Sequence, residues 1–308
     1  MSDLLLLINP LAGQKRANKM LCDIGAVFQE YGFRTELHIT TRREDAKVFT
    51  ASEASNYDRI VCIGGDGTLN EVISGVIASG SDVPVGYIPA GSTNDYANTL
   101  GLSSDILTAA RDAAGDRIVD LDVGSFNGRT FIYTASCGAF TSASYNTSQT
   151  MKNTLGHIAY IFGGLADLAS MRPYHIAVEC NGERFEEDYL FCSVTNSTSI
   201  GGILKLSSET VHLNDGVFEV ILVRNPENPI DLSEIIRDLS TMALPSRMVR
   251  FFSAQRISFD MDDPVPWTLD GEWDKGAAHV ELVNHHGAIR FILPSVRDND
   301  PSNGVIED

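Results

Sequence analysis

The sequence predicts a mixed α/β fold in two parts: a mostly parallel α/β sheet first, then mainly antiparallel β structure. Three observations support this prediction. Short apolar runs alternate with helical patterns over the first part. The pattern changes near Ile118, and Asn-Gly pairs at 127–128 and 181–182 then mark hairpin turns. The 308 residues are enough for about two domains of ordinary size.

In the first part, each predicted strand is followed by a loop and a helix. Residues 4–8 are apolar throughout, which favours a strand buried on both faces. The helix after them carries apolar residues at helical spacing and stops at Gly32. The predicted strands are 4–8, 33–39, 59–63 and 85–88, and the predicted helices are 16–31, 44–54, 68–78, 95–100 and 105–114.

The second part is rich in short β segments. The predicted strands are 118–123, 130–136, 175–180, 184–185, 189–195, 217–223, 255–261, 279–284 and 288–293, with helices near 155–169 and 232–242. The apolar stripe of helix 155–169 fits core packing better than a lipid-facing wall. His285 and His286 precede Gly287, so we expect an exposed hairpin turn there. Residues 295–308 are polar and are expected to form a disordered tail.

The composition excludes several classes of protein. Lys+Arg is 23 and Asp+Glu is 41, so the net charge is 23 − 41 = −18. This charge argues against nucleic-acid binding, and against electrostatic docking on anionic lipid unless local basic patches provide it. The N-terminus lacks the pattern of a signal peptide and no run is long enough to span a bilayer, so a cytoplasmic protein is expected. The five scattered cysteines are expected to be reduced and mostly buried.

The strongest local signal is the segment Gly64-Gly65-Asp66-Gly67-Thr68, which follows an apolar strand and opens a helix. Glycines let a backbone approach phosphate oxygens closely. The helix N-terminus supplies N–H groups and a positive dipole end. A tight strand-to-helix turn is the alternative. An Asp between glycines, followed by Thr68, favours the phosphate-binding interpretation.

Two further loops support this interpretation. Asn9-Pro10 with Gly13 follows the first strand, and Gly91-Ser92-Thr93-Asn94-Asp95 follows the fourth. Loops after parallel strands share one edge of the sheet, where ligands bind. Lys15 and Arg16 either meet phosphate charge or form a solvated first helical turn.

The β part carries carboxylates at turn-like positions. Asp270-Gly271-Glu272 and Asp215-Gly216 each read first as hairpin turns. Asp120 and Asp122 alternate, so they lie on one face of a strand. Carboxylates without a basic neighbour in sequence often hold Mg²⁺ through waters.

In combination, these motifs resemble the soluble bacterial diacylglycerol kinase-like lipid kinases, which are related to sphingosine and ceramide kinases. The resemblance covers roughly residues 4–293, with four motifs in family order. It implies an α/β ATP-binding domain over 1–122, with residues 286–294 packing back on it. It also implies an antiparallel β-sandwich lipid-binding domain over 123–285, with the active site in the cleft between the two domains.

The resemblance also implies roles for individual residues. Asp270 would be the catalytic base, with Glu272 beside it. Asp66 would hold the catalytic Mg²⁺. Asp215 and the main-chain oxygen of Leu213 would hold a structural Mg²⁺, with Asp95 and Asp122 in a shared water network; Asn214 departs from the second carboxylate that relatives often carry, which predicts a weaker site. The implied ATP and phosphate contacts are Asn9, Gly64, Gly65, Asp66, Gly67, Thr68, Asn70, Glu71, Gly91, Ser92 and Thr93.

The sequence therefore predicts an Mg²⁺-dependent lipid kinase that transfers the ATP γ-phosphoryl group to the hydroxyl of a diacylglycerol-like lipid. Such a protein would act in phospholipid biosynthesis. The partners implied are ATP and a lipid at the inner membrane face, contacted peripherally, with a homodimer left open. The alternatives are a sphingosine or ceramide kinase, an NAD kinase, whose Asn-Glu pair stands farther downstream, and a silent nucleotide- or lipid-binding regulator. The β-rich second part excludes a phosphofructokinase.

Overall fold

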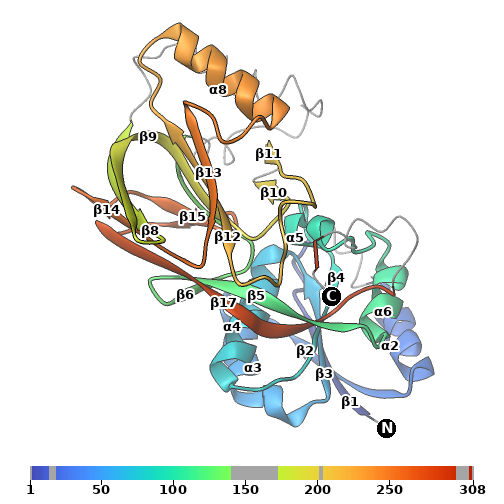
Figure 1. The fold of residues 1–308 in the computed structure, drawn as a ribbon. Helices are drawn as coiled ribbons and strands as arrows, with labels where there is room; N and C mark the ends of the chain where they lie inside the picture. The colour runs from blue at the N-terminus through green and yellow to red at the C-terminus, as the bar shows by residue number, and fades with distance from the viewer. Residues whose placement is uncertain (1, 14–18, 140–172, 201–203, 296–304, 307–308) are drawn as a thin grey trace. The chain divides into compact units, whose positions relative to one another are not determined.

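The computed structural model describes all of the chain except residues 1, 14–18, 140–172, 201–203, 296–304, 307 and 308 (Figure 1). The chain divides into two compact units. Unit 1 comprises residues 1–123, 212–215 and 286–308, and unit 2 comprises residues 124–211 and 216–285. Strands β5 (Ile118–Phe126) and β17 (His279–Ile292) each run from one unit into the other along the chain.

Unit 1 contains the predicted parallel sheet. Its strands follow the order β2-β1-β3-β4, and each neighbouring pair is parallel. The end of β17 continues this sheet, since Phe291 pairs in parallel with Val85 of β4. The strand bounds are β1 (Ser2–Ile8), β2 (Phe33–Ile39), β3 (Arg59–Gly64) and β4 (Val85–Pro89).

Helices cover both faces of this sheet (Figure 1). Leu4, Leu6 and Ile8 point to one face, where they pack with residues of α2 and α6. Helices α3 and α4 lie against each other on the opposite face. The helices are α2 (Leu21–Glu30), α3 (Asp45–Glu53), α4 (Asp66–Ser79), α5 (Asp95–Thr99) and α6 (Ile106–Ala114), with a short 3₁₀ turn η1 (Ala54–Asn56). The predicted bounds hold to within a few residues, except that the helix predicted over 16–31 is observed from Leu21 and residues 14–18 are outside the described part. Helix α4 begins at Asp66, so this residue lies in the first helical turn.

Unit 2 is antiparallel, as predicted. Its main strands follow the order β16-β15-β7-β9-β8-β14-β17, and β12 pairs with both β9 and β13. The Asn181-Gly182 turn joins β8 to β9, and Asn127-Gly128 joins β5 to β6. The elements are β6 (Arg129–Phe131), β7 (Thr134–Gly138), β8 (Tyr174–Cys180), β9 (Glu183–Thr195), β10 (Ser199–Ile200), β11 (Leu204–Lys205), β12 (Phe218–Arg224), α8 (Pro229–Thr241), β13 (Val249–Ala254), β14 (Arg256–Met261), β15 (Trp267–Leu269) and β16 (Glu272–Asp274).

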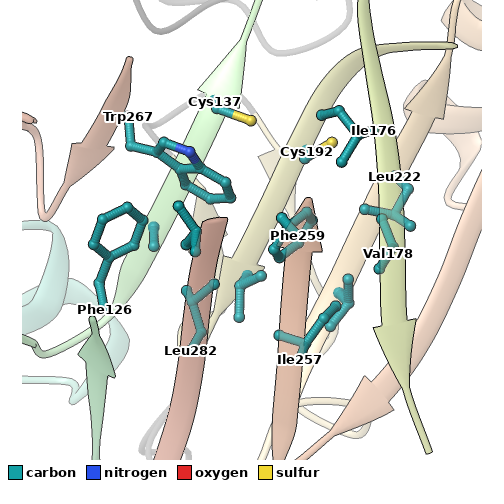
Figure 2. Packing of buried hydrophobic residues seen from close by; sticks show 14 of the residues in the cluster. Phe126, Cys137, Ile176, Val178, Cys192, Leu222, Ile257, Phe259, Trp267 and Leu282 are labelled. Atoms are coloured by element: carbon teal, nitrogen blue, oxygen red, sulfur yellow. The ribbon is translucent and has the colours of Figure 1, made fainter. Parts of the chain in front are cut away.

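A single aromatic-rich cluster forms the core of unit 2 (Figure 2). Trp267 is fully buried, and its ring lies 5.3 Å from the ring of Phe126 and 5.1 Å from that of Phe259. Cys137 and Cys192 point into the same cluster. All five cysteines are free, and all except the exposed Cys22 are buried. Among the described residues, no helix has the length and apolar character needed to cross a membrane.

Three expectations need comment. The turn predicted at His285-His286 is wrong, because β17 is one continuous strand through these residues. The tail is not wholly disordered: Val305 is buried, and its carbonyl accepts a 2.7 Å bond from the Leu213 amide. The helix expected at 155–169 lies outside the described residues, as do Lys15 and Arg16. Strand β13 was missed, and the single strand predicted over 130–136 is two strands, β6 and β7, which pair with different neighbours.

Candidate active site

The loops after β1, β3 and β4 meet at one edge of the unit 1 sheet. Asn9 Nδ2 donates to Thr68 Oγ1 at 3.0 Å, which ties the first loop to α4. The Ala90 amide donates to the Gly64 carbonyl at 2.7 Å, which ties the third loop to the second. The buried Tyr87 hydroxyl donates to the same carbonyl at 3.2 Å. The structure thus joins the three loops that the sequence singled out.

Close backbone contact explains why glycines stand in these loops. A Cβ added to Gly91 would lie 2.6 Å from the Gly65 Cα, so the second and third loops touch backbone to backbone. Gly13 has a φ of +51°, and its Cβ would lie 2.2 Å from the Ala90 carbonyl oxygen. A turn within one loop would not require these contacts between different loops.

The N-terminus of α4 opens into this edge. Gly65 precedes the helix with extended backbone, and the Thr68 and Leu69 amides donate to its carbonyl. The first turn of a helix suits an anion, because its N–H groups and dipole point outward. Ser92 and Thr93 are exposed on the neighbouring loop. The residues present therefore fit a phosphate group.

Asp66 and Asp95 lie together beside this helix start. The Asp95 amide donates to Asp66 Oδ2 at 3.0 Å. Burial raises the pKa of the Asp95 carboxyl above its ordinary value. Two carboxylates in the first turns of α4 and α5, one of them poorly solvated, suit a cation that keeps part of its water shell, as Mg²⁺ does.

Asp122 lies in a second polar cluster of unit 1. Its side chain is 0% exposed, and Oδ1 lies 2.9 Å from His286 Nδ1 and accepts from the Gly287 amide at 2.8 Å. Its own amide donates to the Leu213 carbonyl at 2.8 Å. The structure thus brings Leu213 to Asp122, and the Leu213 oxygen predicted to bind Mg²⁺ already accepts one hydrogen bond.

Direct protein ligands for a metal are few. No group of three or more His, Cys, Asp or Glu residues is arranged to hold a metal ion within the described part of the chain. Asp215 is half-buried and follows Asn214, just before Gly216 with a φ of +82°. This donor set fits Mg²⁺ only with several waters completing its shell.

Glu71 and Asn70 were predicted to contact ATP, and the structure engages both side chains elsewhere. Glu71 Oε1 accepts from the Glu44 amide at 2.8 Å, at the start of α3. Burial raises the pKa of Glu71 despite this bond. Asn70 Oδ1 accepts from the Ser74 hydroxyl one helical turn along α4 at 3.3 Å. Glu71 therefore acts as a cap for α3.

In unit 2, Asp270 and Gly271 form the tight turn between β15 and β16, with φ values of +50° and +80°. The predicted hairpin turn is confirmed, and the Asp270 carboxylate also binds backbone amides of another segment. Its oxygens accept bonds from the amides of Ile132, Tyr133 and Thr134, at 2.7, 2.9 and 3.1 Å. The residue is buried, and these three donors fix its position. The predicted neighbour Glu272 opens β16 and is exposed.

A buried array of hydroxyls adjoins Asp270, and it was not predicted from the sequence. The Ser136 hydroxyl is 2.9 Å from that of Ser193 and 3.3 Å from that of Thr134. Thr268 donates to the Ser136 carbonyl. Ser136 pairs in register with both Ser193 and Thr268, so the three side chains share one face of the sheet. Alternation of small polar residues on neighbouring strands is the signal that would have indicated it.

Comparisons with known proteins agree with this arrangement. The profile of the diacylglycerol kinase catalytic domain matches residues 3–126, and that of the YegS C-terminal NAD kinase beta sandwich-like domain matches residues 135–292. A Bacillus subtilis protein named diacylglycerol kinase is 33% identical over 297 residues, covering 94% of this chain and 95% of that one. One from Staphylococcus carnosus is 30% identical, covering 87% and 88%.

The chain belongs to the diacylglycerol kinase-like family of lipid kinases. The crystal structure of a putative diacylglycerol kinase from Bacillus anthracis has the same fold, with a TM-score of 0.77 and 23% identity over 95% of this chain and 97% of that one. Unit 1 is accordingly the parallel-sheet kinase domain of this family, and unit 2 is its antiparallel β-sandwich domain.

Proposed function

We propose that this chain is an ATP-dependent lipid kinase that phosphorylates the hydroxyl of a diacylglycerol-like lipid and requires Mg²⁺. The observation that carries the proposal is the match, over nearly the whole chain, to relatives named diacylglycerol kinase. The glycine-packed loops of unit 1 and the fixed carboxylate of unit 2 support it.

The nucleotide would bind at the edge formed by the three loops. Backbone groups of Gly64, Gly65 and Gly67 would face its phosphates at the start of α4, beside Thr68. Glycine at 91 lets the loops touch there, because a Cβ on Gly91 would lie 2.6 Å from the Gly65 Cα. Asn9, Ser92 and Thr93 would contact the nucleotide beside them. Asp66, with Asp95 next to it, would hold Mg²⁺. When bound, the ion supplies positive charge that neutralises the phosphate oxygens.

The lipid hydroxyl would meet Asp270. The oxygen of the lipid hydroxyl would form a bond to the γ-phosphorus as the bond from that phosphorus to the bridging oxygen of ADP breaks. The proton of the hydroxyl would pass to the Asp270 carboxylate. Three amides hold the Asp270 carboxylate in place, so it can both orient the hydroxyl and accept its proton. This suits phosphoryl transfer, where positioning and charge dominate.

The substrate lies in a membrane, so the protein would act by peripheral contact at the inner membrane face. No pairing of two chains is needed for this proposal.

A phosphoryl-transfer assay with labelled ATP tests the proposal. The panel should contain diacylglycerol, monoacylglycerol, phosphatidylglycerol, sphingosine, ceramide and NAD. We expect labelled product with diacylglycerol, lost on addition of a chelator and in Asp66→Ala. Transfer to NAD alone would identify the alternative that the β-sandwich profile keeps open. Binding of Mg-ATP without transfer to any acceptor would identify a silent binding protein.

A further inference from the structure

The two tryptophans of the chain lie on one hairpin and have opposite surroundings. Trp267 on β15 is 0% exposed, whereas Trp273 on β16 is 60% exposed. An indole combines a large apolar surface with one polar N–H group, so it is most stable where an apolar medium meets water. Trp273 therefore needs an explanation that Trp267, a core residue, does not.

The hairpin couples Trp273 to Asp270. The turn is tight, since Leu269 pairs with Glu272 and Thr268 with Trp273. Trp273 is three positions after Asp270, so their Cα atoms lie within about 11 Å even for an extended chain. Trp273 and Thr268 are directly opposite and so lie on the same face, which also carries the hydroxyls of Ser136 and Ser193.

A lipid hydroxyl lies at the boundary between acyl chains and water. A carboxylate that contacts it must reach that boundary, and a side chain fixed three residues away must reach it too. The charges nearby are mixed, since the exposed Glu272 precedes Trp273. Asp274, which follows Trp273, is paired with Arg129 at 2.6 Å, and the exposed Lys275 comes next.

We propose that Trp273 is the point at which this protein inserts into a lipid bilayer, and that the β15–β16 hairpin docks Asp270 on the membrane surface. The inference rests on the proposed function, which supplies the lipid. It also explains how a chain of net charge −18 can bind to a membrane. An aromatic anchor does not depend on attraction between a basic protein and anionic lipid.

Intrinsic fluorescence tests the insertion directly, because the chain has only two tryptophans and excitation at the red edge of the indole band avoids its nine tyrosines. With phosphatidylcholine vesicles that contain diacylglycerol, the wild-type emission should shift to the blue and be quenched by brominated acyl chains. Trp273→Ala, whose remaining signal comes from the buried Trp267, should show neither change. Its partition onto sedimented vesicles should fall about tenfold, in line with lost burial of one aromatic side chain.

Matched variants keep the test specific. Ile230→Ala removes another exposed apolar side chain, 77% exposed on α8, and should bind vesicles like the wild type. Trp273→Phe should bind between the wild type and Trp273→Ala. Dispersed short-chain diacylglycerol should be phosphorylated equally by Trp273→Ala and wild type, whereas diacylglycerol in vesicles should be phosphorylated about tenfold more slowly by the variant.

Several results would overturn the proposal. They are an emission unchanged by vesicles, equal sedimentation of Trp273→Ala and wild type, release of the protein from vesicles by salt, or an emission that depends on protein concentration without lipid, which would mean that a second copy covers Trp273. Insertion without phosphorylation of any lipid would support the docking surface and reject the proposed function. The two failures are therefore distinguishable.

Discussion

Asp66 in unit 1 and Asp270 in unit 2 are both held by backbone, but over very different distances along the chain. The surroundings of Asp66 come from loops within about the first hundred residues, packed through Gly65 and Gly91. Asp270 binds amides of residues 132–134, more than 130 positions earlier. The first site depends on the absence of side chains, and the second on three donors converging on one side chain.

The two sites should therefore be sensitive to different kinds of substitution. In unit 1, added volume at a glycine should separate the loops, whatever the chemistry of the new side chain. In unit 2, a change of chemistry at constant volume should be enough, because the donors around Asp270 are fixed N–H groups. Four predictions follow this contrast, in order of expected effect.

Asp270→Asn should lower turnover about 10²–10⁴-fold, because an amide cannot take the hydroxyl proton. It should also destabilise the protein by about 1–3 kcal/mol, since the new NH₂ faces a backbone donor. Turnover, denaturant unfolding and Mg-ATP calorimetry measure the three quantities, and ATP affinity should stay within a few-fold of wild type. Asp262→Asn, an exposed acid of the same unit, is the control. A near-wild-type rate would leave Asp270 as a turn residue.

Gly91→Ala should weaken Mg-ATP binding about tenfold, because a methyl group 2.6 Å from the Gly65 Cα forces the two loops apart. The unfolding free energy should fall by about 1–3 kcal/mol. Gly25→Ala is the matched control: a Cβ there meets no described atom within 4 Å, and alanine should stabilise helix α2 by about 1 kcal/mol. Calorimetry with equal affinities for both variants would contradict the close-packed loops.

Asp215→Ala should reduce activity and remove any response to Mg²⁺ beyond the amount that ATP needs. Asn214→Asp should act in the opposite direction, since an added carboxylate strengthens a site for a hard cation. It should lower the Mg²⁺ concentration for half-maximal activity by a few-fold. A titration at fixed Mg-ATP measures both. Wild-type curves for the two variants would mean that Asp215-Gly216 is a turn and holds no metal.

Glu71 gives the smallest expected effect and tests whether it caps α3 or binds ATP. Glu71→Gln keeps an acceptor for the Glu44 amide, so Mg-ATP affinity should be unchanged, whereas Glu71→Ala should cost about 0.5–2 kcal/mol of stability. Because burial raises the folded-state pKa of Glu71, its contribution is complete below the ordinary carboxyl pKa and is lost as the pH rises through the raised value. The free energy of unfolding, measured across that pH window, should fall with rising pH for the wild type and stay constant for Glu71→Gln. A loss of ATP affinity in Glu71→Gln would restore its predicted role.

Local patterns predicted most of the fold, and in unit 1 they indicated the three loops that the structure joins. The order of strands and helices could be predicted because each apolar run and each Asn-Gly turn lies within a short stretch of sequence. The partners of Asp270 and Asp122 were not readable, since both are joined to residues more than 130 positions away. His286 was mistaken for a turn residue because Gly287, with a φ of +59°, imitates a hairpin inside a continuous strand. Hydroxyls such as Ser136 and Ser193 gave no motif, because their meaning depends on strand register.

The last strand also bears on how the protein is made. Val85 of β4 finds its partner Phe291 about 200 residues later, and Leu213 bonds to Val305 near the end of the chain. As the polypeptide leaves the ribosome, the kinase domain comes first but lacks an edge strand until nearly everything has been synthesised. Domains usually fold in order of synthesis. Here the first domain should be completed last, so a ribosome that stops before β17 would release a chain with β4 exposed and able to pair with other chains.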